Sequence, residues 1–172
     1  MMTIALLLLL LAGLLFWLAQ ALRQPTGIPW VRVVGSDTGG GRTFDHPLFA
    51  RSIGLTGKPD YVLEKRGVCF PVEVKPGREA TSPYESDVMQ VAAYCLLLEA
   101  TTGHSPPYGL LRYARITFRI PYTPAVRDRV LSVLEAMRAD LTREPCARSH
   151  TNPSRCRSCG FVAICEESLI SQ

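Results

Sequence analysis

The spacing of hydrophobic positions changes along the chain, and the first change comes near residue 22. Residues 2–22 are almost entirely apolar, whereas residues 24–44 are rich in Gly, Pro and Thr. The second stretch therefore reads as a linker, with one short strand possible at residues 30–34. Residues 46–53 fit either a short helix or an irregular segment.

The next forty residues carry the clearest signals of regular structure. Residues 57–64 and 68–75 have the composition of strands, and Lys65-Arg66-Gly67 between them predicts a tight hairpin turn. Residues 84–102 are apolar on most sides, which predicts a helix buried against a sheet and ended by Gly103.

A further hairpin and an amphipathic helix follow. Residues 108–113 and 116–122 read as two strands. Residues 124–143 read as a helix, with Pro124 in its first turn and an apolar stripe on one side. The stripe consists of Val126, Val130, Val133, Leu134 and Met137. The order of elements predicts the α/β fold class, with a small mixed β-sheet flanked by helices.

The apolar N-terminal run predicts a transmembrane helix over residues 1–22. Residues 2–22 carry no charge and come close to the roughly 20 residues that cross a bilayer. Ala19-Gln20-Ala21 resembles a signal-peptide cleavage site, but no basic region precedes the run, which favours an uncleaved anchor. Arg23 and Arg32 follow the run and predict a single-pass membrane protein whose C-terminal domain lies in the cytoplasm.

Charge adds one indication about a partner. The formal net charge is +4, and 16 of the 19 basic residues are arginines. The planar guanidinium suits phosphate oxygens, so a phosphate-facing surface is one interpretation, and ordinary solvated surface charge is the other.

Asp60, Glu73 and Lys75 form the candidate catalytic group. Residues two apart on a strand share a face, so Glu73 and Lys75 project together while Val74 points the other way. The hairpin brings Asp60 towards Glu73. Two carboxylates with a backbone carbonyl, here that of Val74, suit Mg²⁺ or Mn²⁺. A cross-strand salt bridge on a solvated sheet is the alternative.

These residues resemble motifs of the PD-(D/E)XK nuclease superfamily, and most closely its RecB-like branch and CRISPR-associated exonuclease relatives. The matching segments are Gly57-Lys58-Pro59-Asp60, Val72-Glu73-Val74-Lys75 and Gln90-Val91-Ala92-Ala93-Tyr94. The resemblance implies a restriction-endonuclease-like core and a metal-dependent DNA nuclease, acting on single-stranded or end-containing DNA and expected to be an exonuclease.

The same resemblance assigns roles to individual residues. Asp60 and Glu73 would be metal ligands, Lys75 the catalytic lysine, and Gln90 and Tyr94 would border the site. Gln90 and Tyr94 are four residues apart and so share a helix face. The family often adds a histidine ligand upstream of the aspartate, and His46 is the candidate here.

Four of the six cysteines lie close together near the C-terminus. Cys146, Cys156, Cys159 and Cys165 have spacing that suits either an iron–sulfur cluster or structural Zn²⁺. Resemblance to the exonuclease relatives favours a [4Fe–4S] cluster. The remaining two cysteines, Cys69 and Cys95, read as core residues. His150 could replace a thiolate, although a solvated histidine is the simpler interpretation.

These assignments predict four parts: an anchor (1–22), a linker (23–45), a nuclease-like domain (46–145) and a cysteine cluster (146–172). Two other hypotheses stay open. One is a non-catalytic, membrane-anchored module with a four-cysteine metal site that binds nucleic acid or a partner protein. Its phosphate contacts would come from Arg112, Arg115 and Arg119. The other is a secreted disulfide protein.

Overall fold

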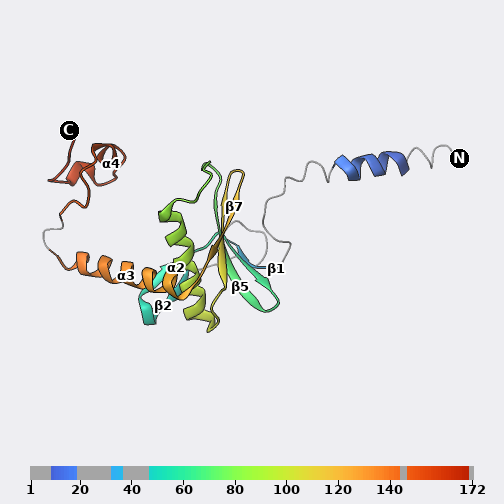
Figure 1. Ribbon diagram of the computed structural model, residues 1–172, viewed down its shortest axis with the longest axis horizontal. Helices are drawn as coiled ribbons and strands as arrows, with labels where there is room; N and C mark the ends of the chain where they lie inside the picture. The colour runs from blue at the N-terminus through green and yellow to red at the C-terminus, as the bar shows by residue number, and fades with distance from the viewer. Residues whose placement is uncertain (1–8, 19–31, 37–46, 144–146, 171–172) are drawn as a thin grey trace. The chain divides into compact units, whose positions relative to one another are not determined.

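The computed structural model describes residues 9–18, 32–36, 47–143 and 147–170. Figure 1 traces the chain, which divides into two compact units, Met1–Val130 and Leu131–Gln172. Residues 9–18 are helical and carry exposed apolar side chains. Within the described parts of the chain, no helix is both long and apolar enough to cross a membrane. The predicted anchor extends on both sides of residues 9–18 into residues outside this description.

The predicted hairpin at the centre of the sequence is present. It pairs β4 (Tyr61–Lys65) with β5 (Val68–Lys75) in antiparallel register. Arg66 and Gly67 turn the chain with φ of 54° and 79°, which is the left-handed geometry of a two-residue hairpin turn. β1 (Arg32–Ser36) pairs with the other edge of β4.

Residues 48–57 form a separate small hairpin. β2 (Leu48–Ala50) pairs with β3 (Leu55–Gly57), and the 3₁₀ turn η1 (Arg51–Ile53) joins them. The sequence predicted a short helix or an irregular segment for residues 46–53, which include β2 and η1. It also predicted a single strand over residues 57–64, whereas the structure separates β3 from β4.

The five-stranded sheet has the order β1-β4-β5-β6-β7 in the described residues. β6 (Tyr108–Tyr113) lies parallel to β5, and β7 (Thr117–Pro121) returns antiparallel to β6. A parallel pair needs a crossover connection, and α2 (Glu85–Thr102) supplies it. The mixed α/β sheet with flanking helices is therefore confirmed.

α2 packs against one face of the sheet and against the β2–β3 hairpin (Figure 1). It is buried on most sides, as predicted, and ends at Gly103, whose φ is 73°. Gly109 on β6 allows the close approach, because a Cβ there would lie 2.3 Å from Val91 Cγ1. Val91 belongs to a core cluster with Leu111, Tyr113 and Ile120. A second cluster on the opposite sheet face contains Leu63, Phe70, Val72 and Leu110.

α3 (Pro124–Leu141) starts at Pro124, as predicted. Its apolar stripe is buried only at Val130, while Val133 and Met137 are 42% and 58% exposed. The rest of the predicted apolar stripe is not buried against the sheet, because the helix beyond Val130 belongs to the second compact unit. That unit also holds α4 (Pro153–Arg157) and the 3₁₀ turn η2 (Val162–Ile164).

Candidate metal centre

Asp60 sits in the break between β3 and β4. Pro59 beside it is fully buried and has no amide hydrogen to donate to a sheet ladder, which explains why the extended chain is interrupted there. The Asp60 carboxylate accepts a hydrogen bond from the Val74 backbone N–H, with 2.7 Å between Oδ2 and the nitrogen. This bond fixes Asp60 beside β5, as the hairpin argument predicted.

Glu73 and Lys75 project from β5 on the face covered by α2. Lys75 Nζ lies 2.7 Å from Glu73 Oε1. Glu73 is only 5% exposed, which is unusual for a carboxylate. Val74 between them packs partly against the core cluster on the opposite face. The predicted alternation is confirmed. The pair is not a solvated cross-strand salt bridge, because both residues lie on β5 and the Glu73 side chain is only 7% exposed.

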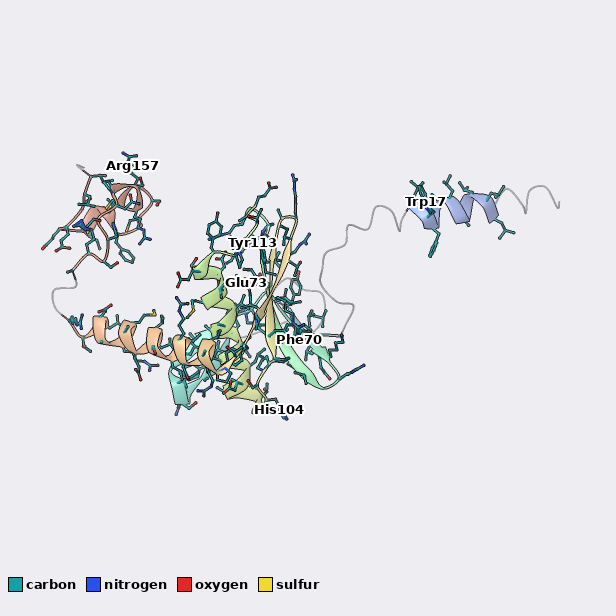
Figure 2. All side chains as sticks on the ribbon, viewed as in Figure 1. Trp17, Phe70, Glu73, His104, Tyr113 and Arg157 are labelled. Atoms are coloured by element: carbon teal, nitrogen blue, oxygen red, sulfur yellow. The ribbon has the colours of Figure 1, made fainter. Side chains whose placement is uncertain are left out.

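α2 supplies two further polar groups. Gln90 Nε2 donates to Glu73 Oε1 at 2.9 Å and to the Tyr94 hydroxyl at 3.0 Å. Gly57 lies directly against Tyr94, since a Cβ at Gly57 would be 2.9 Å from Tyr94 Cε1. α2 therefore holds Glu73 through the hydrogen bond from Gln90. The β2–β3 hairpin packs against Tyr94 through Gly57. Figure 2 labels Glu73 where α2 crosses the sheet.

The electrostatics of the centre keep its lysine charged. Hydrogen bonding to Glu73 raises the pKa of Lys75 above its ordinary value. Burial raises the pKa of Glu73, and the Asp60 charge adds to that effect, while Lys75 and Gln90 oppose it. Burial is also the main cause that raises the pKa of Tyr94. These contacts favour the charged form of Lys75.

The donors at this position fit a hard divalent cation. Asp60 and Glu73 offer carboxylate oxygens, and the Val74 carbonyl would be the third protein ligand. In the described parts of the chain, no group of three or more His, Cys, Asp or Glu side chains is arranged to hold a metal ion. The fourth predicted ligand, His46, lies outside the described residues.

Three of the four tail cysteines, Cys156, Cys159 and Cys165, lie within the described residues. Cys156 is buried in α4, and the Cys159 N–H donates to the Cys156 carbonyl at 3.1 Å, which keeps these two residues in one turn. Cys159 and Cys165 line a hollow of about 690 Å³ with His150. Among the described residues, the Nδ1 atom of His150 is buried without a hydrogen-bond partner, while the residue as a whole is partly exposed. Cys146 lies outside the described residues.

Of the two other cysteines, Cys95 has the environment predicted for a core residue, whereas Cys69 is only partly buried. Cys95 is 1% exposed, and burial raises the pKa of its thiol to about 12. Cys69 is half-buried, and burial raises its pKa as well. Neither thiol is suited to act as a thiolate ligand or nucleophile near neutral pH.

Two of the three arginines predicted to contact phosphate, Arg112 and Arg119, lie on the other side of the sheet from the metal centre. The third, Arg115, follows β6 and pairs with Glu79 at 3.5 Å. Arg112 pairs with Val74, and Arg119 pairs with Leu110, so both side chains lie on the sheet face opposite Glu73. Arg112 donates to Thr117 and to the Ala114 carbonyl. Arg119 stacks on Tyr108, with 3.9 Å between its guanidinium carbon and the ring centroid.

The sequence did not predict a second buried polar group, which lies next to the centre. Asp87 is 3% exposed and pairs with Arg78 at 3.0 Å. The available signal was an acidic residue on a helix predicted to be apolar on most sides, three positions before Gln90. An acidic residue in the first turn of a helix is ordinarily explained by its favourable interaction with the helix dipole. Its position in the sequence therefore did not indicate a buried ion pair.

Comparison with known proteins identifies the family. A sequence profile described as the PD-(D/E)XK nuclease superfamily matches residues 3–166. The chain belongs to the PD-(D/E)XK nuclease superfamily. In this member, β4 and β5 bring Asp60, Glu73 and Lys75 together, and α2 adds Gln90 and Tyr94.

Two curated relatives are similar to this superfamily member. Both are named CRISPR-associated exonuclease Cas4/endonuclease Cas1 fusion. The protein from Leptospira interrogans is 27% identical over 135 residues, which is 73% of this chain and 24% of that protein. The protein from Myxococcus xanthus is 28% identical over 128 residues, which is 69% of this chain and 22% of that protein. The matched region therefore spans about a quarter of each relative.

A solved structure also aligns with the chain. The crystal structure of the protein SSO0001 covers 67% of this chain and 52% of its own, with a TM-score of 0.45 and 21% identity.

Proposed function

We propose that this superfamily member is a Mg²⁺- or Mn²⁺-dependent nuclease that hydrolyses phosphodiester bonds of DNA, at single-stranded or end-containing sites. The observation that carries the proposal is the buried Glu73 carboxylate, which Lys75 and Gln90 both contact beside Asp60. The word exonuclease in the names of both relatives supports cleavage from strand ends.

Asp60, Glu73 and the Val74 carbonyl would hold the divalent cation. When bound, such a cation polarises a phosphate oxygen and lowers the pKa of a coordinated water. In hydrolysis the water oxygen forms a new bond to phosphorus, the bond to the leaving sugar oxygen breaks, and that oxygen takes up a proton.

The side chains of this chain contribute charge and position. Lys75 remains protonated, so it stabilises the negative charge that grows on the phosphate in the transition state. Gln90 holds Glu73 in place through Nε2. Tyr94 receives a second hydrogen bond from the same nitrogen and so fixes the amide orientation.

Two further parts of the proposal concern the ends of the chain. We propose that the N-terminal segment tethers the protein to a membrane with the nuclease domain in the cytoplasm. The exposed side chains of Leu9, Phe16 and Trp17 on the described helix support this, since a helix apolar all round favours lipid. We also propose that the four tail cysteines hold a structural [4Fe–4S] cluster, with Zn²⁺ as the alternative. The hollow lined by Cys159 and Cys165 supports a metal site there.

The first experiment tests catalysis directly. The full chain in detergent is mixed with end-labelled single-stranded DNA and Mn²⁺, and product is resolved on a denaturing gel. Lys75→Ala should lower the cleavage rate of the folded protein by about 100-fold or more. Because the substitution leaves the buried Glu73 carboxylate without its cation, thermal melting is measured alongside to establish that the variant is folded. Lys65→Ala is the matched control, because Lys65 is an exposed lysine on the same hairpin.

Two results would count against the proposal. Unchanged cleavage by folded Lys75→Ala protein would remove the catalytic assignment of this residue. A wild-type protein that binds DNA in a salt-dependent manner but never cleaves it would instead support the non-catalytic binding module.

A further inference from the structure

Four residues beyond the metal centre form a second polar group, here named the Arg78 cluster: Arg78, Tyr84, Asp87 and Tyr113. The Arg78 Nη1 lies 3.0 Å from Asp87 Oδ2. The Tyr113 hydroxyl donates to the same oxygen at 2.6 Å and accepts the Tyr84 backbone N–H at 3.0 Å. Asp87 Oδ2 therefore contacts both Arg78 and Tyr113, and Tyr84 joins the cluster through the Tyr113 hydroxyl.

This cluster is not an ordinary surface ion pair. Asp87 is 3% exposed and Tyr113 is 1% exposed. Exposed pairs contribute little to stability, whereas a buried carboxylate is costly unless cation and hydrogen bonds satisfy it. Burial and the Asp87 carboxylate raise the pKa of Tyr113, so its hydroxyl stays protonated and keeps donating. The guanidinium is thus held in a fixed position.

The backbone places the cluster beside the proposed catalytic lysine. Tyr113 on β6 is the direct partner of Lys75 on β5, so both side chains lie on the face that α2 covers. The Arg78 N–H donates to the Lys75 carbonyl at 3.1 Å, and the Arg78 carbonyl accepts the Ala114 N–H at 3.0 Å. Figure 2 labels both Tyr113 and Glu73.

The outer side of the cluster is accessible. Asp87 is buried, but the Arg78 side chain is 41% exposed. Its guanidinium carbon lies 4.9 Å from the centroid of the Tyr84 ring, and Tyr84 is 50% exposed. A fixed guanidinium suits phosphate oxygens, and an exposed aromatic ring suits an unpaired base.

We infer that the Arg78 cluster is a binding subsite for single-stranded DNA next to the scissile phosphate, an inference that rests on the proposed nuclease function. Arg78 contacts a backbone phosphate, and Tyr84 stacks on the adjoining unpaired base. Asp87 and Tyr113 are positioning residues that act through Arg78. Asp87 neutralises part of the arginine charge, and the exposed donors of the guanidinium still face the strand.

The test measures DNA binding without cleavage. The full chain in detergent and chelator is titrated against a fluorescent single-stranded oligonucleotide at several salt concentrations. Arg78→Gln should weaken binding by about tenfold or more, because a hydrogen bond between charged groups is lost. It should also lower the slope of log affinity against log salt by about 0.7, as expected for one lost phosphate contact on a single strand.

Arg127→Gln is the matched control. Arg127 is also 41% exposed and pairs with the Glu99 carboxylate at 2.9 Å. Glu99 lies 12 residues after Asp87 on α2, which is about 18 Å along the helix. Two other variants guard against misfolding: Arg78→Lys keeps the charge but loses the planar fork, and Tyr84→Ala leaves the backbone donor to Tyr113 in place. Tyr84→Ala should weaken binding of single strands and leave blunt duplex unaffected.

The outcomes are distinct. If Arg78→Gln and Arg127→Gln give the same affinity and salt slope, the subsite does not exist, even when the wild type cleaves DNA. If binding depends on Arg78 but the wild type cleaves nothing with Mn²⁺, the proposed function fails and the subsite stands. Equal loss of single-strand and duplex binding in Tyr84→Ala would overturn the stacking assignment.

Discussion

Gln90 links two residues of the centre through one nitrogen. Its Nε2 donates both to Glu73 and to Tyr94, so the amide orientation depends on both acceptors. Gln90→Leu keeps the size of the side chain and removes the donor. Because Glu73 would lose its orienting contact, we expect apparent Mn²⁺ affinity to fall by about 10–100-fold. Cleavage rate against Mn²⁺ concentration, or calorimetric titration with Mn²⁺, measures this.

Tyr94→Phe is the graded comparison for Gln90→Leu. It removes only the hydroxyl that fixes the amide, so Gln90 still reaches Glu73 and the expected loss of Mn²⁺ affinity is smaller. An unchanged Mn²⁺ dependence in Gln90→Leu would show that Gln90 does not position a metal ligand. A larger effect of Tyr94→Phe would assign the tyrosine a role of its own.

Local periodicity predicted the residue pairs that lie on one element. Glu73 and Lys75 alternate on one strand, and Gln90 and Tyr94 share one helix face, so each pair follows from the chain's own repeat. The contact between Arg78 and Asp87 could not be predicted this way. It depends on the parallel pairing of β5 with β6, which puts Tyr113 beside Lys75. The spacing of residues within a single strand or helix does not predict which strands pair.

At the scale of elements, the contact between α2 and β6 positions the site. A Cβ on Gly109 would lie 2.3 Å from Val91 Cγ1 and 3.2 Å from Pro71 Cγ. Gly109→Ala therefore forces Val91 to shift on α2, the helix that carries Gln90 and Tyr94. We expect the free energy of unfolding to fall by about 1–3 kcal/mol, as for other overpacked cores. Urea unfolding measures the loss, and DNA cleavage should fall with it.

The control for this substitution is Gly77→Ala. Gly77 lies in the exposed turn after β5, and a Cβ there would meet nothing within 4 Å. Stability and cleavage should both stay close to wild type. If Gly109→Ala were as stable as Gly77→Ala, the close approach of helix and sheet would not be needed to hold the site.

Elements with strong local signals were predicted with accurate bounds. β5 and β6 match their predicted ranges, and α2 differs by one residue at its start. The failures have physical causes. Residues 57–64 form two strands instead of one because buried Pro59 interrupts the ladder, and residues 48–50 become a strand because they pair with β3. Pairing between segments overrides weak local preference.

At the scale of the whole molecule, the candidate centre and the cysteine tail belong to different compact units. Asp60, Glu73, Lys75, Gln90 and Tyr94 lie within Met1–Val130. Cys156, Cys159 and Cys165 lie within Leu131–Gln172. The core clusters behind the candidate centre also belong entirely to the first unit. Folding of the candidate centre should therefore not require metal in the tail.

This separation leads to a prediction for the proposed cluster. Cys156→Ser combined with Cys159→Ser removes two thiolates from one turn and should abolish bound iron or zinc in the purified protein. Because structural metal sites contribute folding energy directly, residues 131–172 should become sensitive to limited proteolysis, while Mn²⁺-dependent cleavage is retained. Elemental analysis and absorbance measure the metal and distinguish iron from zinc.

Cys69→Ser provides the control, since Cys69 is a half-buried thiol on β5 in the first unit. It should leave metal content and proteolysis of the tail unchanged. Full retention of iron or zinc by the double variant would exclude this pair as ligands. If the double variant lost cleavage as well as metal, the first unit would depend on the second. The two substitutions change no side chain of the candidate centre, so the loss would have to come from the tail.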